Sequence, residues 1–170
     1  MNNDLNEKLI NSAWNGDLDT INILLTNNGA DVNYLTINNF SALTLAAWNG
    51  QLNIVNVLIT HNANVNHINE DNDETPLILA ARNGYHEIIN LLIDNFANIN
   101  HENCYGDTAL IWASKNGYLY IANVIIAHNA NADHTNQINN RFSPFMYYFL
   151  ILSHKCWEKR IYGLFPTFLN

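Results

Sequence analysis

One short stretch recurs at a fixed spacing along this chain of 170 residues. Ala13-Trp14-Asn15-Gly16 returns as Ala47-Trp48-Asn49-Gly50, and its Asn-Gly pair returns at 83–84 and 116–117. The four glycines are 34, 34 and 33 residues apart. Such a period is typical of repeat proteins, in which each unit packs mainly on its neighbours. The spacing therefore predicts a stacked array.

Each copy has the same internal plan, which is clearest in the third. Thr75 is suited to cap a helix, and Pro76 falls at the first helical position, where its missing N–H is tolerated. Leu77, Ala80 and Ala81 then form one apolar face, and Asn83-Gly84 is expected to end the helix through a left-handed glycine. The apolar run over 88–93 predicts a second helix.

These residues resemble the ankyrin repeat, which has a T-P-L-H-x-A signature and a 33-residue period. The G-A-D-V-N ending of that repeat stands intact as Gly29-Ala30-Asp31-Val32-Asn33. The resemblance implies an all-α ankyrin-repeat solenoid of stacked helix–turn–helix units with projecting β-turn loops. We place the array at 1–137, with repeats over about 5–36, 37–69, 70–103 and 104–136. The signature histidine is replaced by Thr44, Ile78 and Ile111, which puts the family's hydrogen-bond network within each repeat in doubt.

The segment 138–170 departs from the repeat pattern, and it is aromatic and locally basic where the array is acidic. We interpret it as a degenerate C-terminal capping helix followed by a tail. The alternative is a docking segment for other cellular machinery. In that case Cys156, Ile161, Leu164 and Pro166 faintly resemble the cullin-recruiting boxes that end some ankyrin adaptors.

Charge and composition exclude several classes of function. A formal net charge of −8 and a pI of about 5.1 argue against a nucleic-acid partner. Two cysteines cannot form a disulfide framework or a four-ligand zinc site. The sequence shows neither a signal-peptide pattern nor an apolar run long enough to span a membrane. We therefore expect a monomeric cytoplasmic protein without a membrane partner, with export by a route lacking a classical signal left open.

No arrangement of residues predicts catalysis, a cofactor or a metal site. His67, His101 and His134 share one repeat position, but neighbouring repeats lie about 8–10 Å apart, too far for one metal centre. We expect these histidines to be solvated turn residues. The acidic run 70–74 lacks the glycine of a calcium loop and is expected to be a solvated turn tip. We predict that the protein is not an enzyme.

The residue before each Asn-Gly is the variable part of the repeat. Trp14, Trp48, Arg82 and Lys115 occupy it in turn, off the Leu/Ala core face. Tryptophan and arginine often dominate the binding energy of protein interfaces, although the two indoles have the alternative of packing on each other without a partner. The resemblance implies that these residues line a concave surface with the turn tips, which offer Ile37, Phe40, Asp71, Glu74, Tyr105 and Asp107.

These residues suggest a non-catalytic module that binds a partner protein through the concave face. A partner with an apolar anchor and a basic neighbour would suit that face. The alternative function is a substrate-receptor adaptor, or a secreted effector, whose C-terminal segment recruits other machinery.

Overall fold

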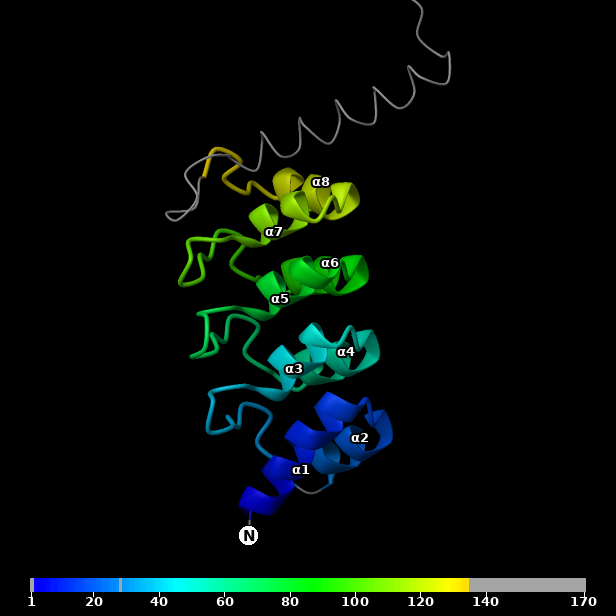
Figure 1. The fold of residues 1–170 in the computed structure, drawn as a ribbon. Helices are drawn as coiled ribbons and strands as arrows, with labels where there is room; N and C mark the ends of the chain where they lie inside the picture. Colours follow the sequence, from blue (N-terminus) through cyan, green and yellow to red (C-terminus); the bar gives the residue numbers. More distant parts are fainter. Residues whose placement is uncertain (1, 28, 135–170) are drawn as a thin grey trace, which may run out of the picture.

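The computed structural model describes residues 2–27 and 29–134, which form four helix pairs. Figure 1 shows the pairs stacked one above another from the N-terminus, with the turns between pairs projecting on one side. The described part contains no β-strand, only an isolated bridge between Leu35 and Ser41. The all-α prediction is therefore confirmed. The pairs are α1 (Asn2–Asn15) with α2 (Leu18–Thr26), α3 (Ala42–Trp48) with α4 (Leu52–Thr60), α5 (Pro76–Asn83) with α6 (His86–Asp94), and α7 (Ala109–Lys115) with α8 (Leu119–Ala127).

Hydroxyl residues begin the first helix of the second, third and fourth pairs. Ser41, Thr75 and Thr108 have extended backbones, and each side chain accepts a hydrogen bond from the backbone N–H three residues later. Thr44 closes a capping box by accepting from the backbone N–H of Ser41. The threonine thus supplies a local hydrogen bond where the ankyrin signature has histidine, whereas Ile78 is buried among apolar side chains.

The glycine of the Asn-Gly pair has two structural roles in the central repeats. Gly84 has a φ of 82° and forms the left-handed C-cap of α5, as the sequence predicts. A Cβ atom on Gly50 would lie 2.7 Å from the Tyr85 ring of the next pair, and one on Gly84 would lie 2.8 Å from the Tyr118 ring. Gly50 and Gly84 therefore also make room for a ring from the following pair.

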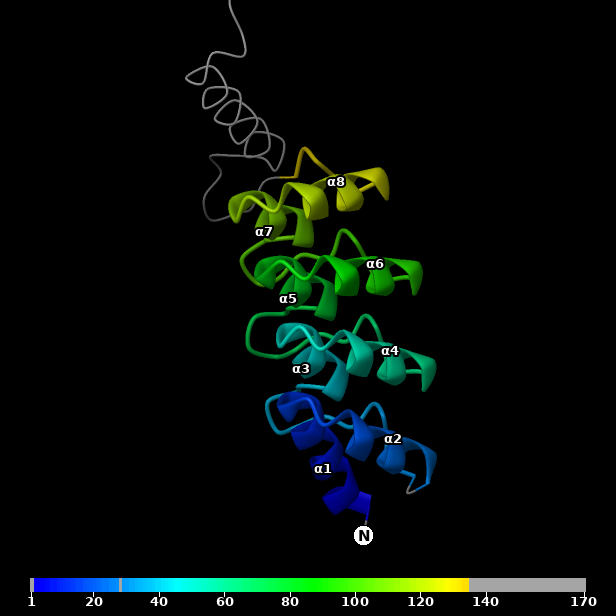
Figure 2. The ribbon, with the colours of Figure 1, turned by 90° about the vertical axis from the view of Figure 1, so that its right-hand side faces the viewer.

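The helices form two layers that run the length of the array. α1, α3, α5 and α7 pack successively in one layer, and α2, α4, α6 and α8 in the other (Figure 2). Leu43, Leu77 and Leu110 are almost fully buried between the layers. With 14 residues α1 is twice as long as α3 or α7, so the first pair differs from the others, which is common for the end unit of a repeat array.

The predicted capping helix and the predicted docking motif both fall in 138–170, outside the described residues. None of the described helices is long and apolar enough to cross a membrane.

Candidate functional site

The residues that precede Asn-Gly form a continuous column along the first helices. The Trp14 and Trp48 rings meet edge to face, with centroids 6.0 Å apart. The guanidinium carbon of Arg82 lies 5.7 Å from the Trp48 ring centroid. Trp14 keeps 48% of its surface exposed, whereas Trp48 is partly covered. The two indoles pack on each other, as the alternative reading allowed, and the column still presents an aromatic edge to solvent.

Trp112 joins this column, although the sequence analysis did not select it. Its ring lies between two cations, 5.6 Å from the guanidinium carbon of Arg82 and 5.2 Å from the Lys115 ammonium nitrogen. Cation–π contacts of this kind are worth about 0.5–2 kcal/mol each. Trp112 takes the repeat position that Leu45 and Leu79 fill in earlier pairs, where both are buried. A tryptophan in place of two leucines was the signal in the sequence. We call Trp14, Trp48, Arg82, Trp112 and Lys115 the inner column.

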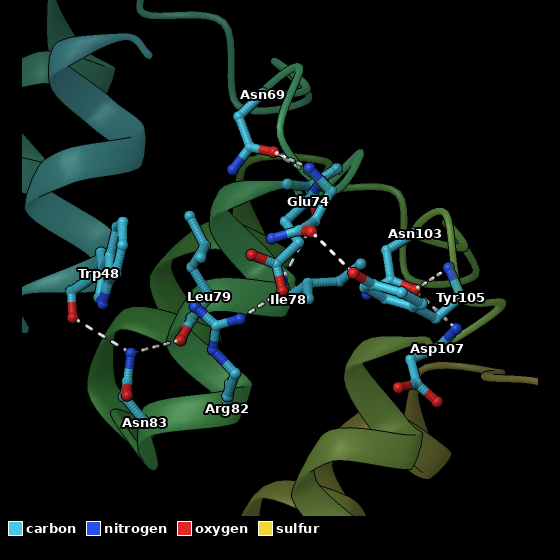
Figure 3. Close-up of polar contacts among 12 residues, drawn as sticks. Trp48, Asn69, Glu74, Ile78, Leu79, Arg82, Asn83, Asn103, Tyr105 and Asp107 are labelled. Carbon is cyan, nitrogen blue, oxygen red and sulfur yellow. Dashed lines mark hydrogen bonds and ion pairs between the residues drawn. The ribbon is translucent and has the colours of Figure 1, made fainter. Parts of the chain in front are cut away.

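Three residues that precede Asn-Gly, namely Trp48, Arg82 and Lys115, each contact the residue eight positions earlier in the chain. The Phe40 and Trp48 ring centroids are 6.1 Å apart. Arg82 donates to Glu74 Oε1 at 2.6 Å (Figure 3), and Lys115 Nζ donates to Asp107 Oδ1 at 2.8 Å. The same two positions of the repeat are therefore occupied by two aromatic rings in the second helix pair, and by an ion pair in both the third and the fourth.

The prediction that Glu74 and Asp107 are exposed turn residues was wrong. Glu74 is 2% exposed and Asp107 is 5% exposed. Both residues directly precede a helix cap, where the turn folds back against the helix. Their backbone N–H groups donate to the side chains of Asn69 and Asn103, at 3.2 and 2.8 Å. This closure directs both carboxylates toward the cations of the inner column instead of toward a partner.

Burial raises the pKa of Glu74, and the nearby charge of Asp107 adds to that rise. The Arg82 charge and hydrogen bond act in the opposite direction without cancelling the effect of burial. The 2.6 Å contact indicates that Arg82 is held by this carboxyl group. Arg82 is therefore not a free cation on the surface.

Other predicted residues lie exposed in the turns. Ile37 is 98% exposed between α2 and α3, and Asp71 is exposed between α4 and α5. Tyr105, between α6 and α7, is also exposed, and its hydroxyl donates to Asn72 Oδ1 at 3.2 Å. The backbone N–H of Cys104 donates to the Asn72 carbonyl at 3.0 Å, so these two turns are joined directly.

Three sets of side chains that link neighbouring repeats or neighbouring turns were not predicted. The first is the asparagine of Asn-Gly, whose Nδ2 donates to the carbonyl of the variable residue one repeat earlier. These bonds are Asn49 to Trp14 at 3.0 Å, Asn83 to Trp48 at 3.2 Å (Figure 3), and Asn116 to Arg82 at 2.8 Å. The second set is Asn33, Asn66 and Asn100, whose Oδ1 atoms accept from the backbone N–H groups of Asn64, Asn98 and Asn131 at 2.8, 2.7 and 2.8 Å.

The third set is the histidine ladder: these residues lie in turns and stay partly exposed, but each makes a hydrogen bond that the sequence analysis did not predict. His67, His101 and His134 each bond through Nε2 to a carbonyl of the preceding turn, at 2.7, 2.7 and 3.0 Å. The accepting residues are Asn39, Asp73 and Gly106, all with positive φ. A carbonyl only accepts, so Nε2 carries the proton in each case. Among the described residues, no His, Cys, Asp and Glu side chains group in a way that could hold a metal ion.

Two comparisons with known proteins bear on this arrangement. The family model described as ankyrin repeats (3 copies) matches residues 2–69 and 43–138. No curated protein matches the chain significantly. Proteins built from these repeats are generally non-catalytic modules for protein–protein interaction. The family match covers most of the sequence and agrees with the stacked helix pairs, and the chain therefore belongs to the ankyrin repeat family.

Proposed function

We propose that this protein binds a partner protein through the face formed by its turns and first helices, called here the inner face. The single observation that supports this most is the exposed apolar surface at its N-terminal half. Trp14 is half-exposed and Ile37 is almost fully exposed, although apolar packing partners are abundant in this fold. Exposed aromatic and aliphatic side chains are typical of binding sites.

The side chains of the inner column are held in place by one another, so this part of the inner face is already ordered. Trp48 contacts Trp14, Phe40 and Arg82, so its ring is held on three sides. Arg82 is fixed by Glu74 and by two indole rings. A surface that is already ordered loses less side-chain entropy on binding, which favours affinity. The protein would therefore act by shape and side-chain complementarity, without turnover.

The experiment compares two double variants in affinity purification of the full chain from cells, followed by quantitative mass spectrometry. Trp14→Ser/Ile37→Ser removes the exposed apolar groups of the inner face. Ile23→Ser/Phe96→Ser is the matched control, because both residues are apolar and at least half-exposed. Ile23 lies on α2 and Phe96 directly follows α6, so both belong to or adjoin the layer of α2, α4, α6 and α8, called here the outer layer.

We expect the first variant to lose the enriched partner and the control to retain it, with the same helical circular dichroism for both. Retention of every partner by Trp14→Ser/Ile37→Ser would disprove the assignment of this face. Loss in the control alone would place binding on the outer layer.

A further inference from the structure

The formal charges of the connecting turns are acidic. Arg82 and Lys115 are engaged by Glu74 and Asp107, as described above. No lysine or arginine occurs in the connecting turns 27–41, 61–75 and 95–108. The exposed carboxylates Glu70, Asp71 and Asp73 lie together in the turn between α4 and α5. Glu102 lies in the next turn, with its Oε1 3.5 Å from His134 Nδ1. The turns therefore attract cations. The two basic side chains of the inner column do not oppose this, because their charges are already paired.

Apolar groups stand directly beside these carboxylates. Leu35 and Ile68 occupy the same position in successive turns, and both are more than one-third exposed. Asn39 joins the two turns, because its Nδ2 donates to the Ile68 carbonyl at 3.1 Å and its own carbonyl bonds to His67. Exposed aliphatic side chains therefore lie in the acidic turn itself, at Ile68, and in the turn one repeat before it, at Leu35 and Ile37.

We infer that the partner presents a basic–apolar segment to this face, an inference that rests on the proposed function. One or two aliphatic or aromatic side chains of the segment cover Leu35, Ile37 and Ile68, and a lysine or arginine contacts Glu70 or Asp71. Successive repeats lie about 8–10 Å apart, which an extended segment spans in about three residues. The residue of the partner that covers Ile37 and its basic residue are therefore about three positions apart.

An acidic partner does not fit these contacts. Within the inner column it would have to bind Arg82 or Lys115, and each of these already has a carboxylate within 3 Å. Releasing either cation would leave Glu74 or Asp107 buried without its ion pair, which is unfavourable. It would also bring negative charge close to Glu70, Asp71 and Asp73.

The test uses the full chain as bait for a displayed library of random twelve-residue peptides. We expect the enriched peptides to carry Lys or Arg about three positions from Leu, Ile, Phe or Trp. In fluorescence anisotropy, their affinity should fall about fivefold for Glu70→Gln/Asp71→Asn, the effect of two exposed charge pairs. Affinity should also fall as salt is raised. Asp19→Asn/Asp94→Asn is the matched control, since both residues are exposed carboxylates on outer helices, and it should leave affinity unchanged.

Failure of this inference differs from failure of the proposed function. One outcome is that the enriched peptides have no excess of basic residues but fail to bind Trp14→Ser/Ile37→Ser. This would overturn the inference of a basic–apolar segment and leave the inner face as the binding site. Peptides that bind this variant and its parent equally would overturn both. A library that yields no enriched peptide also counts against a short basic–apolar segment. Enrichment of sequences like 155–168 of this chain, which holds Lys159-Arg160-Ile161-Tyr162, would point to its own segment as the occupant instead of a separate partner.

Discussion

At the scale of single residues, a comparison of two glycines with the same φ distinguishes the cost of a left-handed backbone from the cost of a steric clash. Gly50 and Gly117 both have a φ of 74°. A Cβ on Gly50 would lie 2.7 Å from the Tyr85 ring, whereas one on Gly117 would meet nothing within 4 Å among the described residues. We expect Gly117→Ala to reduce the free energy of unfolding by about 1 kcal/mol, the cost of a left-handed alanine. Gly50→Ala should cost at least about 1 kcal/mol more, because Tyr85 must move. Urea unfolding measures both, and equal losses would contradict the role given to the ring.

Phe96 holds a conformation that suits other residues better. It has a φ of 64° and is 88% exposed, so its ring gains little burial. The equivalent positions are Gly29, Asn62 and Asn129, types that tolerate positive φ. We expect Phe96→Asn to raise the free energy of unfolding by about 0.5–1 kcal/mol. Phe96→Ala is the control: it removes the ring but keeps the strain, and should change stability little. A loss of stability in both variants would show that the ring makes a stabilising contact.

The buried carboxyl of Glu74 makes stability depend on pH. Burial raises the pKa of Glu74 above its value in the unfolded chain, so the folded state binds this proton more tightly. Its contribution to stability is therefore full below the unfolded pKa and is lost as pH rises through the folded pKa. Glu74→Gln cannot titrate, so its free energy of unfolding should increase relative to the unaltered chain from about pH 4 to pH 7. A constant difference across chemical unfolding curves in that range would contradict this assignment.

At the scale of helices and turns, the pairing of positions eight residues apart allows an exchange between repeats. The second helix pair uses Phe40 with Trp48 where the third uses Glu74 with Arg82. Glu74→Phe/Arg82→Trp copies the aromatic pair into the third. We expect the double variant to be as stable as the unaltered chain or more stable, because apolar residues often replace a buried ion pair without loss.

The single variants give the contrast for this exchange. Arg82→Trp alone leaves the Glu74 carboxylate buried without its ion pair and should cost about 3 kcal/mol. Thermal and urea unfolding of the two single variants and the double variant complete a cycle. A double variant less stable than Arg82→Trp would show that the aromatic pair does not fit the third repeat.

Sequence patterns predicted the helices well and the contacts between repeats poorly. Thr75 and Gly84 mark helix ends by local chemistry, which needs no knowledge of neighbouring repeats. Glu74 was assigned to the surface because it ends an acidic run, and only the closure of its turn directs it inward. The bond from Asn83 to the Trp48 carbonyl joins residues 35 positions apart, and its side chain was assigned only a role in ending the helix. The partner-binding role of the inner face stays a prediction, since surface residues of a repeat follow no periodic rule.

At the scale of the whole molecule, stability comes from a series of interfaces between adjacent pairs. Each interface combines buried leucines with the asparagine bonds described above. In such an array, stability approximates to the sum of the units and their nearest-neighbour contacts. Fewer than about three units are seldom stable alone. Loss of the central interface, between α3–α4 and α5–α6, leaves two halves of two helix pairs each, and neither half is expected to be stable. Loss of the first interface leaves three stacked pairs.

Hydrogen exchange distinguishes these interfaces. Asn83→Ala removes the donor to the Trp48 carbonyl at the central interface and should cost about 1 kcal/mol. Asn49→Ala/Gln51→Ala removes both side-chain donors to the Trp14 carbonyl at the first interface. We expect Asn83→Ala to speed amide exchange in all four helix pairs, because neither half persists when the centre opens. The variant at the first interface should speed exchange chiefly in α1 and α2, since the remaining three pairs stay stacked. Faster exchange confined to α5 and α6 in Asn83→Ala would show that the pairs open independently, and the array would then unfold one unit at a time.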